Sequence, residues 1–206
     1  MYLKKISLEN FRCFEKVEVD LQKKLTLVVG ANGAGKTSLL ESIAIAMSTM
    51  FTAFDGAKAM NITKESAHLK ACKIGSTDNV QSQYPVRIGA WAQMDERSEI
   101  YWERTLNTAK GKTTTKDAKQ ILEVASDYQK RIQERDTSLL LPIIAYYGTG
   151  RLWDYHREKQ TDIFEKSTRT NGYIGCMSGT ANIKLMMNWF LKMTVQKYQN
   201  QENGYG

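Results

Sequence analysis

Eight residues near the N-terminus, 30–37, constrain this chain more than any other segment, and they read GANGAGKT. They match the phosphate-binding loop pattern G-x-x-x-x-G-K-[ST], whose glycines allow positive φ and close approach of the backbone to a phosphate. The N–H groups of such a loop and the positive end of the helix that follows it face the anion. The residues predicted to bind the nucleotide through this loop are Gly30, Gly33, Ala34, Gly35, Lys36, Thr37 and Ser38.

The residue types of the motif indicate which nucleotide groups they meet. Lys36 is expected to reach the β- and γ-phosphates as a point charge, and Ser38 to donate to the α-phosphate. The Thr37 hydroxyl is the predicted metal ligand, for Mg²⁺. A glycine-rich turn with a purely structural role would leave the Lys36-Thr37 pair unexplained. The motif therefore predicts a site for ATP and Mg²⁺.

The residues on either side of the loop predict a strand and a helix. Residues 25–29 are an apolar, β-branched run with the length of a buried strand. After the loop, Leu40, Ile43 and Met47 recur at helical spacing, in a helix expected to reach about Phe54. A strand, a glycine-rich loop and a helix in this order predict an α/β fold of the P-loop NTPase class.

Charge and composition restrict the partners only loosely. The chain has 206 residues and a formal net charge of +7, with 42% hydrophobic residues. That length is enough for one sizeable core. A basic protein is compatible with nucleic-acid binding, and equally with a protein that binds ATP alone. The lysines are spread along the chain, so the sequence by itself does not define a basic patch.

The cysteines and the hydropathy favour a cytoplasmic protein. Cys13, Cys72 and Cys176 are far apart and, with the 2 histidines of the chain, lack the spacing of a zinc site. An odd, scattered set of thiols suits a reducing compartment. No apolar stretch approaches the roughly 18 residues of a membrane-spanning helix. The N-terminus begins a strand rather than a signal peptide.

Hydrophobic periodicity predicts the remaining elements. Alternation of apolar and polar residues predicts half-exposed strands at 2–10, 15–21, 84–94 and 98–106, the last two joined by a turn at 95–97. Amphipathic helices are expected at 117–135, with Ile121, Ala125, Tyr128 and Ile132 on the apolar face, and at about 182–198.

Three further segments complete the pattern. Residues 55–82 are weakly patterned, with several turn residues. Residues 108–115 form a polar loop rich in Lys and Thr, which we expect to be mobile. Residues 139–147 are the second strongly apolar run, which predicts a central strand.

The acidic residues that a P-loop ATPase needs for hydrolysis are not recognisable. Asp95-Glu96 follows a partly apolar run that Gln93 interrupts, which favours a charged turn over a Mg²⁺-binding strand end. Residues 176–179 faintly resemble the serine-glycine signature of ABC-type ATPases, but a helix N-cap at Ser178 or Thr180 is the favoured interpretation. The sequence thus predicts nucleotide binding without naming a catalytic residue.

Two segments carry a family resemblance. Residues 6–14, ISLENFRCF, followed by GANGAGKT and SLLESIA, resemble the opening of the SMC/RecF-type branch of ABC ATPases. Residues 141–153, LPIIAYYGTGRLW, resemble a narrower group, the bacterial AAA-family ATP-binding proteins related to OLD-family ATPases and to PtuA, the ATPase of Septu-type anti-phage systems.

The resemblance implies roles for residues outside the loop motif. Arg12 would lie near the nucleotide, and Asn32 would sit at the tip of the loop. Residues 148–151 occupy the place of a glutamine-bearing loop that senses Mg²⁺ and the γ-phosphate. This chain has no Gln there, and Arg151 is the best candidate for that role. The structural alternatives are a surface arginine at position 12 and packing of Arg151 against Trp153 or Tyr155.

The resemblance also implies an architecture. We expect the N-terminal lobe of an ABC-type head, with a mixed β-sheet around the P-loop helix. Residues 1–206 would form a single P-loop ATPase domain, the N-terminal part of a longer ATPase. Residues 55–137 would be an insertion in this lobe, with a β-hairpin and an amphipathic helix. The family's signature helix, Mg²⁺-binding Asp and catalytic Glu are missing from this sequence.

Three functions are compatible with these observations. The first is an ATPase whose two heads form a homodimer around two ATP molecules and control a DNA-acting partner or a nuclease, in anti-phage defence. The second is a RecF-like DNA repair ATPase. The third is a nucleotide-binding interaction protein without turnover, since no catalytic acid is recognised.

Overall fold

The computed structural model describes residues 1–54, 56–74, 77–94, 99–149, 169–177 and 183–202. It divides into two compact units, Met1–Ile144 and Ala145–Gly206. The nucleotide-binding loop belongs to the larger, N-terminal unit.

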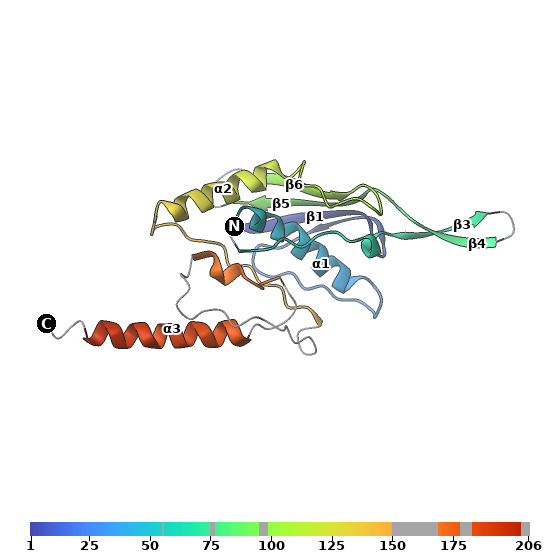
Figure 1. The fold of residues 1–206 in the computed structure, drawn as a ribbon. Helices are drawn as coiled ribbons and strands as arrows, with labels where there is room; N and C mark the ends of the chain where they lie inside the picture. The colour runs from blue at the N-terminus through green and yellow to red at the C-terminus, as the bar shows by residue number, and fades with distance from the viewer. Residues whose placement is uncertain (55, 75–76, 95–98, 150–168, 178–182, 203–206) are drawn as a thin grey trace. The chain divides into compact units, whose positions relative to one another are not determined.

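The larger unit is built on a four-stranded sheet with the order β2-β1-β5-β6 (Figure 1). The strands are β1 (Tyr2–Phe11), β2 (Phe14–Asp20), β5 (Val86–Gln93) and β6 (Glu99–Leu106). All three neighbouring pairs are antiparallel. The four predicted strands are therefore confirmed, while the turn at 95–97 lies outside the described residues.

Side chains alternate between the two faces of this sheet, and one face is buried while the other faces solvent. Side chains of the buried face include Ile6, Ile88 and Trp102, each 0% exposed. Helix α1 (Lys36–Met47) packs against β1 and β5. The Trp102 indole donates a hydrogen bond to the Ala46 carbonyl over 3.0 Å. The sheet and α1 thus form the main core, and the N-terminus of α1 carries the nucleotide-binding loop.

The buried face of α1 differs from the predicted one. Leu39, Ser42 and Ile45 are buried, whereas Leu40 is 48% exposed. The helix is apolar almost all round, so spacing alone does not select a face, and the sheet buries the side that contacts it. A short helix, η1 (Ser48–Ala53), continues the chain, in agreement with the expected end of the helical segment near Phe54.

Helix α2 (Lys119–Gln133) packs against η1 and β6. Ile121, Ala125 and Tyr128 are buried, which confirms the predicted amphipathic helix and three of its apolar positions. Ile132 is only half-buried.

The segment that appeared weakly patterned contains a hairpin. A 3-10 turn, η2 (Lys64–Ser66), leads into β3 (Leu69–Ile74) and β4 (Thr77–Ser82), which form a separate two-stranded sheet. The hairpin projects away from the four-stranded sheet (Figure 1). Both faces of its middle are exposed, so burial did not impose the alternation that reveals a half-buried strand.

Two predicted strands are wrong for the described structure. Neither residues 25–29 nor residues 139–147 lie in a strand. Leu25, Leu27 and Val29 are 78%, 79% and 80% exposed, and Ile143 is 98% exposed. A buried strand needs neighbours on its edges, and no described strand pairs with either segment. The predicted α/β class of the P-loop fold is confirmed. The predicted mixed sheet would also contain parallel strand pairs, but all the described strand pairs are antiparallel.

The smaller unit contains η4 (Arg169–Tyr173) and α3 (Ile183–Glu202). Helix α3 confirms the last predicted helix and continues beyond it. Within this unit, the Tyr146 N–H donates to the Cys176 carbonyl over 2.8 Å. Among the described residues, none of the helices has the length and apolarity needed to cross a membrane. Asp95, Glu96, Arg151, Ser178 and Thr180 lie outside the described residues.

Candidate nucleotide-binding site

The loop of residues 30–38 has the backbone that the motif predicts. Gly33 and Gly35 adopt positive φ angles of 82° and 91°. Within the loop, the Ala34 N–H donates to the Ala31 carbonyl over 3.2 Å. Gly35 is the N-cap of α1, and it supplies no side-chain cap. The loop therefore turns directly into the first turn of the helix.

The N-terminus of α1 is suited to an anion. Lys36, Thr37 and Ser38 form its first turn, where backbone N–H groups have no partner within the helix. The first turn contains no acidic residue, so no carboxylate neutralises the positive end of the helix dipole. N–H groups and dipole together are the physical basis of phosphate binding at helix N-termini.

Gly35 is fixed by its neighbours as well as by its φ angle. A Cβ atom at this position would lie 2.6 Å from Cys13 Sγ and 2.6 Å from Phe14 Cζ. The turn between β1 and β2 therefore packs directly against the base of the loop. At Gly33, by contrast, a Cβ atom would meet nothing within 4 Å. The loop is held from the β1–β2 side and open around Gly33.

Lys36 lies over the loop. Its Nζ donates to the carbonyl oxygens of Gly30 and Ala31, over 2.8 and 2.7 Å. These bonds use two of the three ammonium hydrogens, and phosphate oxygens would compete with the two carbonyls for them. The ammonium is therefore already positioned at the loop, as the motif requires.

The residue types also fit a magnesium ion bound together with phosphates. Thr37 is in the first turn of α1 and is not buried, and its hydroxyl is a hard oxygen ligand of the kind Mg²⁺ prefers. Among the described residues there is no group of three or more His, Cys, Asp or Glu side chains suited to a metal. Mg²⁺ usually keeps several waters and is held by few protein ligands plus substrate phosphates.

Arg12 occupies an unusual backbone conformation beside this loop. Its φ is 50°, and that of Asn10 is 54°. Positive φ is uncommon for residues other than glycine. The turn is held by backbone bonds: the Arg12 N–H donates to the Ser66 carbonyl over 2.7 Å, and the His68 N–H to the Asn10 carbonyl over 2.8 Å. The His68 ring adds a 2.7 Å contact between Nδ1 and the Arg12 carbonyl.

The Arg12 side chain reaches α1. Its Nη2 lies 2.6 Å from Glu41 Oε2 and donates to Oε1 over 2.7 Å. Glu41 follows the loop by about one helical turn, so this ion pair fixes the β1–β2 turn to the helix that carries the loop. Contact of Arg12 with the nucleotide stays a prediction. Asn32 is exposed, and its position at the loop tip likewise stays a prediction of the resemblance.

Sequence reasoning missed the residues that support the loop. Cys13, Phe14 and Glu41 contact the loop or Arg12, although their residue types signal neither phosphate nor metal binding. They meet because the antiparallel β1–β2 turn and the start of α1 lie at the same end of the sheet. Their only sequence signal was their position inside the first of the two segments that carried the family resemblance.

Comparison with known families decides the assignment. The family model described as "AAA domain" matches residues 5–202, which is nearly the whole chain. The chain belongs to this AAA domain family. Within it, the sequence is of the SMC/RecF type, and its fold is of the α/β P-loop class.

Individual relatives agree with this assignment. The DNA replication and repair protein RecF of Clostridium acetobutylicum is 46% identical over 43 residues, which are 21% of this chain and 12% of RecF. Structural maintenance of chromosomes protein 6 of Saccharomyces cerevisiae is 38% identical over 66 residues, 32% of this chain and 5% of that protein.

A third relative matches along most of the AAA domain. The retron Vc95 probable ATPase of Vibrio cholerae is 22% identical over 194 residues, which cover 91% of this chain and 36% of that ATPase. The chain therefore spans only 5 to 36% of the length of these relatives.

Proposed function

We propose that this AAA domain binds MgATP at the loop of residues 30–38. The observation that carries the proposal is the loop itself: two glycines with positive φ lead into a helix N-terminus without an acidic residue. Lys36 is already held over this loop. A loop with these features is a binding site for a phosphate chain.

Each residue then has a distinct role. The backbone of Gly30, Gly33, Ala34 and Gly35 forms the cradle, and Ser38 donates to the α-phosphate. Lys36 binds the β- and γ-phosphates, and Thr37 ligates Mg²⁺. Arg12, held beside α1 by Glu41, contacts the nucleotide from the β1–β2 side. Asn32 and Arg151 are also proposed to bind the nucleotide, on the basis of the family resemblance alone.

We further propose that residues 1–206 are the N-terminal part of a longer ATPase, in which 55–137 form an insertion. Support comes from apolar surface next to the site. Leu25, Leu27 and Val29 are 78 to 80% exposed, and Leu40 on the neighbouring helix is 48% exposed. A contiguous apolar run of this kind normally lies inside a sheet. Further strands, supplied by residues outside this chain, would cover it.

In the intact protein, we propose that two heads form a homodimer around two ATP molecules and so control a DNA-acting effector, such as a nuclease, in the cytoplasm. Support for a role in anti-phage defence is the resemblance of residues 141–153 to the Septu-type group. The match to the retron Vc95 probable ATPase, across 91% of this chain, agrees with that choice.

Two alternatives have some support of their own. The match to RecF, 46% identical over 43 residues, favours a DNA repair ATPase, but it is confined to 21% of the chain. The lack of a recognised catalytic acid favours a nucleotide-binding interaction protein without turnover. Asp95 and Glu96 lie outside the described residues, and a catalytic role for them is not proposed.

The test is assembly and turnover of the protein expressed from its complete gene. We expect sedimentation velocity to give a dimer with MgATP and a monomer without it, and phosphate release that rises when duplex DNA is added. Lys36→Ala should remain monomeric under both conditions. MgATP-dependent dimers without phosphate release would favour the interaction protein. A sedimentation coefficient unaffected by MgATP would contradict head dimerisation. A nuclease gene beside this gene would favour defence over repair.

A further inference from the structure

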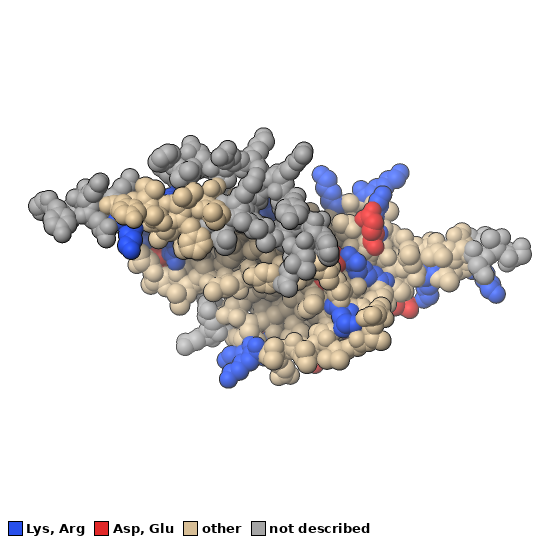
Figure 2. All heavy atoms as spheres, turned by 90° about the horizontal axis from the view of Figure 1, so that it is seen from below, with Lys and Arg blue, Asp and Glu red and all other residues tan. Residues whose placement is uncertain are grey.

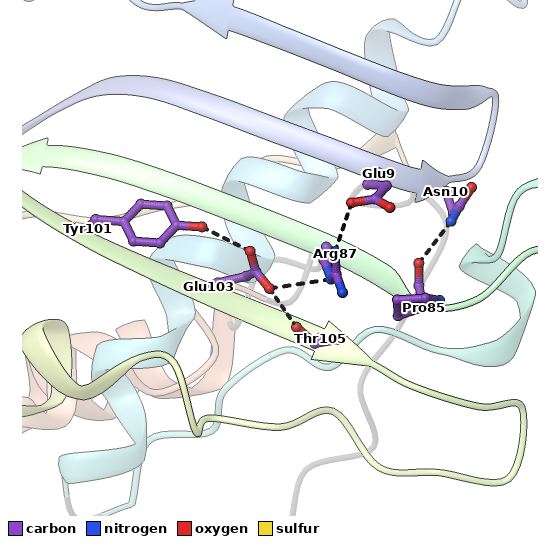
Figure 3. A network of polar contacts seen from close by, with 7 residues as sticks. All are labelled: Glu9, Asn10, Pro85, Arg87, Tyr101, Glu103 and Thr105. Atoms are coloured by element: carbon purple, nitrogen blue, oxygen red, sulfur yellow. Dashed lines mark hydrogen bonds and ion pairs between the residues drawn. The ribbon is translucent and has the colours of Figure 1, made fainter.

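The solvent-facing side of the main sheet offers little free positive charge. Arg87 lies 3.2 Å from Glu9 and 3.7 Å from Glu103 (Figure 3). Glu103 also accepts hydrogen bonds from the hydroxyls of Tyr101 and Thr105, over 2.8 and 3.0 Å. Burial, and next the hydrogen bond to Glu103, raise the pKa of Tyr101, so its hydroxyl stays protonated. On the same sheet Lys4 and Lys5 are paired with Glu99 and Glu18.

The loop between β6 and α2 has the opposite character. Residues 107–118, called the β6–α2 loop below, contain Lys110, Lys112 and Lys116, all exposed. No acidic residue lies between Leu106 and Lys116, and none of the three lysines forms an ion pair with a residue that the structure describes. Figure 2 shows lysine and arginine side chains at several separate places on the face drawn there.

The β6–α2 loop is anchored by hydrogen bonds, and the mobility expected from its composition stays a prediction. Thr114 N–H donates to the Thr105 carbonyl over 2.8 Å, and the Gly111 N–H to the Thr108 carbonyl over 3.0 Å. The Thr113 hydroxyl accepts from the Ile62 N–H over 2.9 Å and donates to the Ile62 carbonyl over 3.0 Å. The loop that carries the lysines is therefore hydrogen-bonded to Thr105 on one side and to Ile62 on the other.

A buried arginine joins the same loop to the core. Arg104 is 1% exposed, and desolvation lowers its pKa. Its guanidinium donates to the Thr114 carbonyl over 3.3 Å, to Thr49 Oγ1 over 3.1 Å and to Asn61 Oδ1 over 3.0 Å. These acceptors are neutral, so Arg104 adds positive charge beneath the loop instead of cancelling it.

The β6–α2 loop leaves the sheet at the same end as the nucleotide-binding loop. Strands β1 and β6 are both antiparallel to β5, so they run in the same direction and finish at the same end. The end of β1 leads into the turn that packs against Gly35. The end of β6 leads into the lysine-bearing loop. Figure 1 shows both at the end of the sheet from which the β3–β4 hairpin projects.

We propose that the β6–α2 loop is a contact surface for the phosphate backbone of duplex DNA. Exposed ammonium groups supply affinity without reading sequence, and threonine hydroxyls commonly donate to phosphate oxygens. The proposal rests on the proposed DNA-acting function and names where DNA would bind. Its place at the nucleotide end of the sheet would let the same end respond to both ligands.

The test compares two sets of neutralised lysines. The triple variant Lys110→Gln, Lys112→Gln, Lys116→Gln should bind a duplex DNA of mixed sequence at least about tenfold more weakly than the parent at physiological salt. The slope of log K against log salt should fall by about 3, since each lost phosphate contact removes roughly one unit. The weakening should be the same for unrelated sequences, because no base is read.

The matched control is Lys119→Gln with Lys130→Gln, two lysines on α2 that are paired with Glu123 and Glu134. We expect this variant to bind DNA as the parent does. An unchanged affinity and salt slope in the triple variant, or an equal loss in the control, would overturn the proposal. Tighter binding of duplex RNA than of DNA would overturn the choice of ligand.

The same variants separate this proposal from nucleotide binding. The triple variant should bind MgATP as the parent does, since none of its lysines lies in the loop of residues 30–38. Lys36→Ala, measured without nucleotide, should keep its affinity for DNA. If Lys36→Ala loses MgATP binding while the triple variant still binds DNA normally, the proposed DNA surface is rejected and the proposed nucleotide site is left standing.

Discussion

At Gly35 two requirements coincide: a φ of 91° and a space that the side chains of Cys13 and Phe14 already fill. Gly33 meets only the first, because its φ is 82° and a Cβ atom there would have nothing within 4 Å. Both glycines were predicted for the same reason, their freedom to adopt positive φ, but only the structure shows that Gly35 is also a contact between the loop and the β1–β2 turn. The two glycines should therefore tolerate alanine differently.

We predict that Gly33→Ala destabilises the domain by about 1 kcal/mol, the cost of a left-handed conformation for a residue with a side chain. Gly35→Ala should cost about 1–3 kcal/mol more, because Cys13 and Phe14 must also move. Urea unfolding with a common slope gives both values. Equal losses in the two variants would show that the β1–β2 turn does not press on the loop.

Among the elements, the strands with one solvent face were predictable, whereas the two apolar runs predicted as buried strands are not strands in the described structure. In β1 and β5 the alternation of apolar and polar residues follows from packing of one face on α1, and in β6 it follows from packing on α2. Ile6 and Leu8 of β1 are examples of the buried positions. The run at 25–29 is apolar on both sides, and whether such a run forms a strand depends on neighbours that sequence spacing does not reveal. For α1 the same uniform apolarity hid which side faces the sheet.

The residues of the candidate site also divide into those that the sequence predicts and those that only the structure shows. Residues 30–38, which are proposed to contact phosphate, were predictable because the chemistry of phosphate binding restricts their types. The supporting contacts of Cys13, Phe14 and Glu41 depend on which turns the sheet brings together. Likewise, the lysines of the β6–α2 loop form a defined group only once Thr113 and Thr114 are seen to anchor it.

We predict that the backbone of residues 25–29 exchanges its amide hydrogens rapidly in the 206-residue chain. Among the described residues these positions have no backbone hydrogen-bond partner. In the protein expressed from the complete gene, pairing with further strands should slow the exchange by about a hundredfold or more. Amides of β1, which is paired on both edges, are the internal control and should be protected in both. Rapid exchange at 25–29 in the complete protein would contradict the proposed additional strands.

At the scale of the whole molecule, the two proposed ligand surfaces lie at one end of an antiparallel sheet. One is the loop at the N-terminus of α1, held by the β1–β2 turn. The other is the β6–α2 loop, joined to the core by Arg104. The first surface is proposed for MgATP and the second for DNA, so that both ligands would act on the same domain.

The most direct measurement is an equilibrium titration of MgATP into the parent protein, Lys36→Ala and Lys58→Ala. Lys58 lies outside the loop, so its variant controls for loss of one positive charge. We predict that the parent and Lys58→Ala bind with the same affinity. Lys36→Ala should bind at least about a hundredfold more weakly, because it loses the charged donor to the phosphates, while its thermal unfolding stays that of the parent. Binding by Lys36→Ala with the affinity of the parent would contradict the account.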